Sequence, residues 1–323
     1  LALTVYSTWD ERVRTELQAA FELQHLATHA AQRQEQIIEG ARQTLVAISL
    51  TLSGTQDDQK QCNAYLLQLL TQSSGIYHSM GIYRSDAVLI CNAIPWKGKI
   101  LSPDRLYFRL PMATGKFAIG EYQVGRVTRQ QGINVGYPIK DAAGQVTAVA
   151  FVAINLGRLN HMAKATPLAK EAVLTVIDRD GVVLAREPEL VGRVGEKLQN
   201  PGVLKMVLAG RNGVFHMRAT DGSGRLWAHE AVADNPDGVI PLRVLVSIPM
   251  SVVFATADRA LERNLVGIAV ALALLLIAAW YGTEYFILRK VRALLAAAGR
   301  VHAGDLGARA GLSDTGEELN RIG

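Results

Sequence analysis

The stretch Ala172-Val-Leu-Thr-Val-Ile177-Asp178-Arg-Asp-Gly181-Val182-Val-Leu184 places two short apolar runs on either side of an Asp-Arg-Asp-Gly turn. Runs rich in β-branched residues around an Asp-Gly pair are typical of a β-hairpin. A helix is expected next, at Pro201–Leu208, and further strands are expected at 213–217, 225–229 and 242–248. A hairpin, a helix and a three-stranded meander in this order predict one compact α+β module.

The preceding part of the chain repeats this pattern. Between residues 76 and 156, short apolar runs are separated by turn residues, as expected for strands. The candidate strands are 75–77, 80–83, 87–91, 118–122, 133–137 and 146–154, with a hairpin turn at Asp141–Gly144. A helix near Leu159–Leu168 would join the two units. We therefore predict two tandem antiparallel-sheet modules, at 57–158 and 159–255.

Residues 7–56 are expected to form a stalk helix ahead of both modules. They contain no proline, and apolar residues recur at intervals of three, four or seven, which is the helical period. These positions include Leu23, Leu26, Ala30, Ile37, Ala41, Leu45 and Ile48. The helix would pair with a partner or lie along the domain that follows. Two shorter helices that meet near Gly40 are the alternative.

A long apolar run extends from Leu265 to Leu288. Its 24 positions carry a single charge, Glu284, and a helix needs about 20 apolar residues to cross the hydrocarbon core of a membrane. The alternative is a buried helix of a globular domain, but few protein cores enclose a helix that is apolar on every face. We predict a transmembrane helix with its approach at 256–288.

The charges that flank this run predict its orientation. Arg289, Lys290, Arg292 and Arg300 follow the run with no acid among them, whereas Arg259 and Arg263 before it alternate with Asp258 and Glu262. The positive-inside rule then places residues after about 288 in the cytoplasm and residues before about 265 outside it, in the bacterial inner membrane. Residues 1–6 are interpreted as the end of a first membrane helix. Nucleic-acid binding is not expected from the net charge of +5, because the basic residues are scattered.

Four segments of the first module form a specific set. They are Asp104-Arg-Leu-Tyr-Phe-Arg109, Ala113-Thr-Gly-Lys-Phe117, Gly120-Glu-Tyr-Gln-Val-Gly125 and Tyr137-Pro138. Together they resemble the double-Cache family of bacterial sensors, in which two PAS-like modules are stacked on a long N-terminal helix outside the membrane. The resemblance covers roughly residues 7–255. It implies that the first module is membrane-distal and the second membrane-proximal.

The residues after the apolar run resemble the start of a HAMP relay domain, a parallel coiled coil. Ile287, Val291, Leu294, Ala298 and Val301 follow alternating steps of four and three, the heptad pattern. The usual proline after the membrane is replaced by Lys290, and the second helix, which would open at Glu317, stops at Gly323. The resemblance therefore implies a partial HAMP domain at 289–323 and an output domain beyond it, such as a diguanylate cyclase or a histidine kinase.

A ligand pocket in the distal module should hold a few polar groups on an otherwise apolar sheet. The candidates are Arg105, Tyr107, Arg109, Tyr122, Arg126 and Tyr137. Arginine forks bind carboxylates bidentately while tyrosines cover the ligand body, so this mixture favours an amino acid or a small carboxylate. The alternative is that Tyr107 belongs to the core and that the arginines are surface ion-pair partners.

Cys62 and Cys91 lie in the part expected to be extracytoplasmic, where an oxidising compartment would let them form a disulfide; two buried thiols are the alternative. The seven histidines show no carboxylate or cysteine at ligand spacing, so neither a metal nor another cofactor is expected. Asp178 and Asp180 are assigned to the hairpin turn rather than to catalysis. No catalytic motif occurs, and enzymatic activity is not expected of this chain.

These features predict the sensory part of a homodimeric transmembrane receptor. A small extracytoplasmic ligand would bias a two-state relay that runs through the membrane helix into the coiled coil. The alternative is an ectodomain that binds a partner protein and no small ligand.

Overall fold

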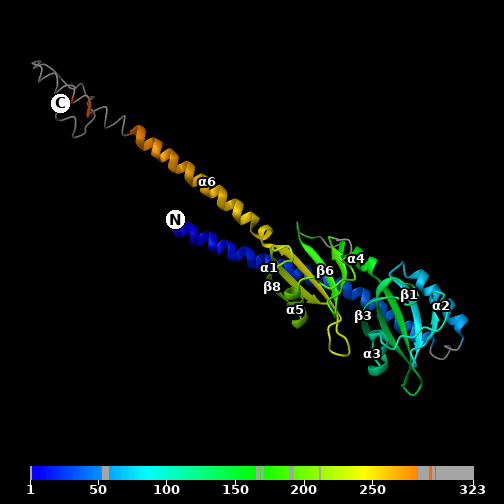
Figure 1. Ribbon diagram of the computed structural model, residues 1–323. Coiled ribbons are helices and arrows are strands. Elements are labelled where there is room, and N and C mark those ends of the chain that lie inside the picture. The colour runs from blue at the N-terminus through cyan, green and yellow to red at the C-terminus, as the bar shows by residue number, and fades with distance from the viewer. Residues whose placement is uncertain are drawn as a thin grey trace, which may run out of the picture. The chain divides into compact units, whose positions relative to one another are not determined.

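The computed structural model describes residues 2–52, 58–164, 168, 171–188, 193–210, 212–282, 291, 292 and 295. Residues 1–255 form one compact unit, and residues 256–323 form another. The first unit contains two five-stranded antiparallel sheets and the long helix α1 (Figure 1). The predicted α+β fold class, with its long N-terminal helix and two tandem sheet modules, is confirmed. Apart from residues 291, 292 and 295, the predicted HAMP segment lies outside the described residues.

Helix α1 (Ala2–Leu52) runs for 51 residues without a break, so the alternative of two helices that meet at Gly40 is excluded. One stripe of the helix is buried, and it contains Leu23, Ala27, Ala30, Ala31, Ile38, Ala41, Leu45, Ile48 and Leu52. Four of these nine residues are alanines, whose short side chains allow strands to approach the helix closely. The periodicity that predicted the helix is therefore the periodicity of its packing face.

The distal module follows α1 in the chain. Its elements are α2 (Gln59–Gln72), β1 (Tyr77–Arg84), β2 (Leu89–Asn92), α3 (Leu106–Thr114), β3 (Ala118–Val124), β4 (Gln131–Lys140) and β5 (Val146–Asn155). The strand order is β2-β1-β5-β4-β3. The two strands predicted at 75–77 and 80–83 are one strand, β1, which continues through His78 and Ser79. Gly81 within it serves close packing. A Cβ atom on Gly81 would lie 2.5 Å from the Phe151 ring and 2.8 Å from the Cys91 carbonyl oxygen.

The proximal module has the same architecture. Its elements are α4 (Leu156–Lys164), β6 (Val173–Asp178), β7 (Val183–Glu187), α5 (Pro201–Ala209), β8 (Gly213–Arg218), β9 (Gly224–Ala231) and β10 (Leu242–Pro249). The strand order β7-β6-β10-β9-β8 repeats that of the distal sheet. Each strand predicted here is present with bounds shifted by at most three residues. Helix α4 begins at Leu156, three residues before the predicted start of the joining helix.

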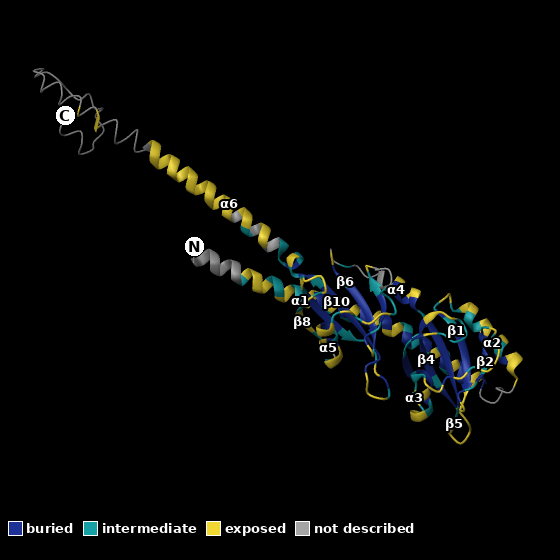
Figure 2. Cartoon of the chain, in the orientation of Figure 1, coloured by how far each residue is buried: buried dark blue, intermediate teal, exposed yellow. Residues whose placement is uncertain are grey.

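The core is divided into layers by the two sheets (Figure 2). One continuous apolar cluster joins α1 to one face of both sheets. A separate cluster, with Tyr83, Tyr107, Phe108 and Phe151, lies under α3 in the distal module. A third cluster, with Val203, Val207 and Trp227, lies under α5 in the proximal module. Each sheet therefore has one face on the shared helix and a second face closed by its own short helix.

The two modules are joined by side chains that hydrogen-bond to the backbone of β3, an edge strand. The buried Asn235 side chain accepts a hydrogen bond from the Ile119 amide at 2.8 Å and donates one to the Ile119 carbonyl at 2.7 Å. The Asp178 carboxylate accepts a bond from the Tyr122 amide at 2.9 Å. An asparagine amide offers both a donor and an acceptor, so Asn235 replaces a neighbouring strand at this point.

Helix α6 (Met250–Gly282) contains the segment Leu261–Tyr281, which has a mean hydropathy of 2.2 and is not buried within the structure. Among the described residues, α6 is the one helix long and apolar enough to cross a membrane. The predicted run of Leu265–Leu288 overlaps this segment, and its last six residues lie outside the described part of the chain.

Gly136 on β4 allows α3 to dock, and this contact gives a first prediction. A Cβ atom at Gly136 would overlap the Tyr107 carbonyl oxygen, which is backbone and cannot rotate away. We expect Gly136→Ala to lower the free energy of unfolding by about 1–3 kcal/mol, measured by denaturant unfolding. Gly213→Ala on β8 is the matched control, because its nearest new neighbour, the His229 ring, would lie 3.8 Å away. Equal stability of the two variants would contradict this account of α3 docking.

Candidate functional site

A small cavity lies on the α3 side of the distal sheet. It holds about 20 Å³, which is room for about one water molecule. Its lining residues are His78, Ser79, Tyr83, Arg105, Tyr107, Gln123, Gly125, Arg126, Val127, Thr128, Asn134, Phe151 and Ala153. Most of these side chains are polar and converge from β1, α3, β3 and β4. The cavity thus combines an aromatic wall with hydrogen-bonding groups, as expected of a site for a polar ligand.

Three of the six predicted ligand-binding residues, Arg105, Tyr107 and Arg126, line this cavity. Tyr107 is buried, and its hydroxyl group interacts with Tyr83, Ser102 and Asn134. Burial, with Tyr83 beside it, raises the pKa of the Tyr107 hydroxyl far above its ordinary value. The hydroxyl therefore stays protonated and can donate a hydrogen bond at any physiological pH.

The two arginines of the cavity differ in how they are paired. Arg126 donates to both carboxylate oxygens of Asp104 at 2.8 Å, to the Ser102 hydroxyl at 2.9 Å and to the Leu101 carbonyl. Arg105 is held loosely, with its Nε 3.7 Å from Asp104 and its Nη1 4.0 Å from Glu121. Burial raises the pKa of Asp104, but its bond from Arg126 and the nearby charges outweigh burial and hold that pKa below its ordinary value. Arg105 therefore keeps donors that a ligand carboxylate could use.

The other three predicted residues lie elsewhere. Arg109 is exposed on α3, one turn beyond Arg105. Tyr137 packs against the core cluster that contains α1. Tyr122 packs against the same cluster and faces the proximal module, where a Cβ atom on Gly195 would lie 2.5 Å from its hydroxyl. Successive strand side chains point to opposite faces, so a shift of one position separates Tyr122 from the cavity.

Sequence reasoning passed over several residues of the cavity, namely His78, Ser79, Gln123 and Asn134. Asn134 is a polar residue between the apolar Ile133 and Val135, and this alternation was the available signal. Gln123 had no such signal, because Glu121 and Tyr122 precede it. His78 carries a buried Nδ1 atom without a hydrogen-bond partner. Burial lowers the pKa of the His78 imidazole, so this side chain is neutral at pH 7.

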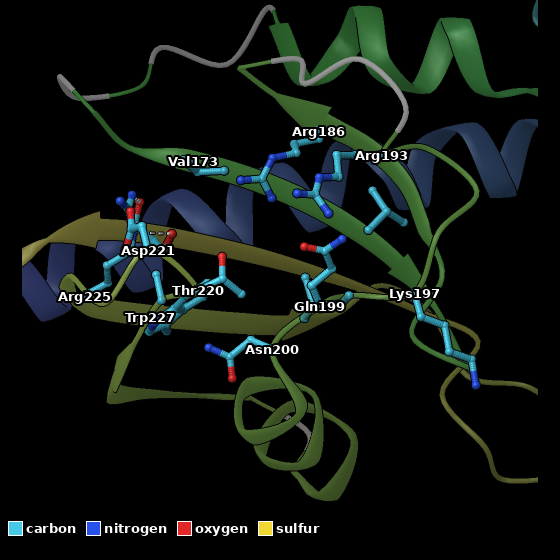
Figure 3. A pocket seen from close by; sticks show the side chains of 14 residues that line it. Val173, Arg186, Arg193, Lys197, Gln199, Asn200, Thr220, Asp221, Arg225 and Trp227 are labelled. Atoms are coloured by element: carbon cyan, nitrogen blue, oxygen red, sulfur yellow. Dashed lines mark hydrogen bonds between the residues drawn. The ribbon is translucent and has the colours of Figure 1, made fainter.

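A second cavity of about 130 Å³ lies in the proximal module, where Arg186, Arg193, Lys197 and Arg225 gather on the lining (Figure 3). None of the six predicted residues is among the residues that line it. Within the described ranges, no group of three or more histidine, cysteine or acidic residues is placed to hold a metal ion.

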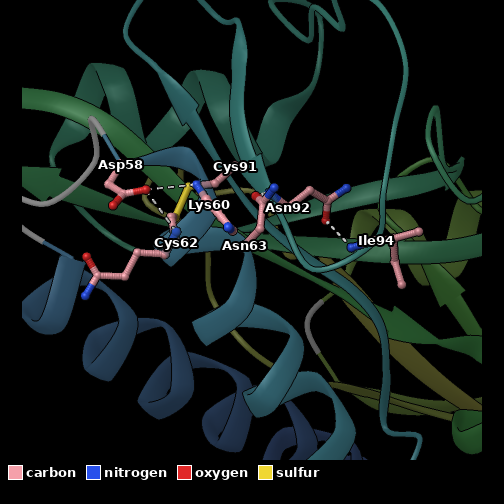
Figure 4. The surroundings of a disulfide bond; sticks show 8 residues. Asp58, Lys60, Cys62, Asn63, Cys91, Asn92 and Ile94 are labelled. Atoms are coloured by element: carbon pink, nitrogen blue, oxygen red, sulfur yellow. Dashed lines mark hydrogen bonds between the residues drawn. A yellow bond between two sulfur atoms is a disulfide. The ribbon is translucent and has the colours of Figure 1, made fainter.

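A disulfide joins Cys62 of α2 to Cys91 of β2, with their Cα atoms 6.0 Å apart (Figure 4). Both cysteines are buried. The Asn63 side chain accepts a hydrogen bond from the Asn92 amide at 2.9 Å. The residues that follow the two cysteines therefore form a second contact between α2 and β2. The disulfide thus fixes α2 to the edge of the distal sheet.

Comparison with known proteins identified structural relatives. No family model and no curated protein sequence matches the chain. The extracellular domain described as that of histidine kinase rpHK1S-Z16 is similar over 73% of this chain and 97% of its own, with 20% identity and a TM-score of 0.63. The ligand-binding domain of Mlp24, solved with asparagine, matches over 76% and 98%, with 18% identity and a TM-score of 0.59.

A third relative is the ligand-binding domain of the Pseudomonas aeruginosa amino-acid chemoreceptor PctB, solved with L-arginine. It matches over 73% of this chain and 97% of its own, with 13% identity and a TM-score of 0.57. The chain has the double-Cache fold. At these levels of identity the likeness concerns the fold.

The disulfide gives a second prediction. It closes a loop with a sequence separation of 29 residues, and chain-entropy reasoning assigns such a loop a stabilisation of about 3–4 kcal/mol. We expect the Cys62→Ala, Cys91→Ala double variant to unfold with a lower free energy by about this amount. Wild-type protein treated with dithiothreitol should match the variant, whereas the variant itself should not respond to the reductant. A double variant as stable as the wild type would show that the bond contributes nothing.

His78 gives a third prediction. Because burial depresses the folded-state pKa, the unfolded chain binds more protons as the pH falls through the unfolded value of about 6.5. The contribution of His78 is therefore present above that pH and is lost below it. We expect the melting temperature to fall between pH 7.5 and pH 5.5, and His78→Asn to reduce this fall. His161→Asn, at an exposed position on α4, is the control and should keep the wild-type slope.

Proposed function

We propose that this chain is the sensory part of a bacterial signal-transduction receptor and that its distal module binds a small ligand outside the cytoplasm. The observation that carries the proposal is the loosely paired Arg105, which faces a polar cavity beside Tyr107 and Asn134. A guanidinium with unused donors in a partly buried site favours a carboxylate-bearing ligand. We propose an amino acid or a small carboxylate, with Arg105, Tyr107 and Arg126 among its contacts.

Ligand entry requires the distal cavity to open, because about 20 Å³ does not hold an amino acid. The Arg126–Asp104 pair is the contact that would have to change, since it joins the turn after β3 to the segment before α3. A ligand carboxylate on Arg105 or Arg126 would compete with Asp104 for the same donors. This competition would link occupancy to the position of α3.

We further propose that α6 crosses the inner membrane and passes the change to the cytoplasm. The exposed apolar segment Leu261–Tyr281 and the basic residues after Leu288 support this orientation. In this proposal the receptor is a homodimer. A HAMP coiled coil at 289–323 would lead to an output domain such as a diguanylate cyclase or a histidine kinase.

The small volume of the distal cavity favours one alternative, an ectodomain that binds a partner protein without a small ligand. The ligand experiment below separates the two functions.

The chain, in nanodiscs of neutral lipid, is screened by thermal unfolding against the common amino acids and small carboxylates. A ligand present at about 100 times its dissociation constant stabilises by about 2.7 kcal/mol, which corresponds to about 5–10 °C in a domain of this size. We expect Arg105→Gln to weaken the ligand about tenfold or more, because a charge-assisted contact is lost.

Arg109→Gln is the matched control, since Arg109 lies on the same helix but outside the cavity. It should leave the ligand-induced shift unchanged. The proposal fails if no compound raises the melting temperature, and this outcome would favour the partner-binding alternative. It also fails if the two arginine variants behave alike.

A further inference from the structure

The proximal cavity occupies the same topological place as the distal cavity. In the distal module the lining comes from β1, β3, β4 and β5, on the face closed by α3. In the proximal module it comes from the corresponding strands β6, β9 and β10, together with β7, on the face closed by α5. Equal strand orders make these faces equivalent. The proximal cavity is about six times larger, at about 130 Å³ against about 20 Å³.

The lining of the proximal cavity carries an excess of positive charge. Arg186, Arg193, Lys197 and Arg225 line it, and Asp221 is the one acidic residue among the residues that line it. Arg186 and Arg193 extend into the space from the β7 side, whereas the exposed Lys197 side chain points away from them (Figure 3). The three guanidinium groups are therefore the cationic donors that a ligand in this space would meet.

Among the described residues, two of these arginines form no salt bridge with a carboxylate. Among the described residues, Arg186 makes no salt bridge; its Nη1 donates to the Thr175 hydroxyl at 3.3 Å, and its buried Nε has no partner. Arg225 donates to the Ser247 hydroxyl at 3.1 Å and to the carbonyls of Glu171 and Ser247. Arg193 pairs with Glu196, at 3.6 Å.

The arginines of the cavity repel one another. Burial and the nearby positive charges of Arg193 and Arg225 lower the pKa of Arg186. Burial likewise lowers the pKa of Arg225. Guanidinium groups remain charged in proteins, so their mutual repulsion destabilises the folded state. A bound anion would relieve this repulsion. A buried Nε without a partner is a further donor that such an anion would satisfy.

We propose that the proximal cavity is a second ligand site, which binds a small dianion through Arg186, Arg193 and Arg225. The volume corresponds to about four water molecules, well below the roughly 300–1,000 Å³ of sites for drug-sized molecules. The indole ring of Trp227 forms an apolar wall, with its Nε1 already bonded to the Met217 carbonyl. An apolar wall beside cationic groups suits a short dicarboxylate, whose methylene groups can pack against the indole ring. An inorganic dianion carries the same charge but has no apolar part to contact this wall.

The test uses isothermal titration of the chain in nanodiscs of neutral phosphatidylcholine, which presents no anionic headgroups to the site. The probes are succinate, its uncharged diamide and sulfate. We expect succinate to bind with an affinity that falls as the salt concentration rises, and the diamide not to bind. Weaker binding of sulfate would assign the site to dicarboxylates, and equal or tighter binding would assign it to inorganic dianions; either result supports a dianion site.

Two variants connect the binding to the cavity. Arg186→Gln should weaken the bound dianion about tenfold or more, since it removes a charge-assisted contact. Arg193→Gln should do the same, and it changes a loop residue whose only ion pair in the described part of the chain is exposed, so folding is not at risk. Arg218→Gln, at an exposed position on β8, is the control and should keep the wild-type affinity.

The proposal is independent of the distal ligand. Arg105→Gln should leave succinate binding intact, and loss of binding in that variant with retention in Arg186→Gln would move the dianion to the distal module and overturn the proposal. Absence of binding by succinate and sulfate to the wild-type chain would overturn it as well. Neither result would decide whether an amino acid binds in the distal cavity.

Discussion

The fold depends on the burial of one stripe of α1 against both sheets. Nine residues of this helix, from Leu23 to Leu52, belong to the apolar cluster that also contains the inner faces of the distal and proximal sheets. A sheet with one face exposed to water would leave its apolar side chains unburied, so neither module is complete without the helix. The stripe of the helix is buried against these two sheets, and α1 also contacts α4. The three parts therefore stabilise one another.

The outer face of each sheet, opposite the face that packs on α1, does not contribute to this shared core. Each is closed by a short helix, and each encloses a cavity lined by polar or cationic residues. The alternation of side chains along a strand separates core residues from cavity residues, because successive residues of one strand point to opposite faces of the sheet. Ile133 and Val135 lie in the core with α1, while Asn134 between them lines the distal cavity.

The fold could be predicted from sequence because its signals are local. Helical period in α1, the Asp-Gly turn after β6 and the apolar strands each depend on neighbouring residues. Helix α3 was not predicted, since it has nine residues and contains Pro111, and its contacts with β4 are long-range.

Of the predicted site residues, Arg105, Tyr107 and Arg126 meet at one cavity. Tyr122 and Tyr137 lie on the opposite face of the sheet, against the cluster that contains α1. The face on which a strand residue lies depends on strand register, which no local sequence pattern predicted. The proximal arginines are spread over Arg186 to Arg225 and converge only through the sheet.

Asp178 connects the hairpin that it closes to a strand of the distal sheet. Its carboxylate accepts bonds from the amides of Asp180 and Val182 in its own turn and from Tyr122 of the distal sheet. The turn is also bonded through the Gly181 carbonyl to Leu198, which lines the proximal cavity, while β3 supplies Gln123 to the distal one. Two binding events that both shift this strand and turn would be thermodynamically linked. Each ligand would then change the affinity of the other by the same factor, and the proposed receptor would report a combination of two solutes rather than the concentration of either.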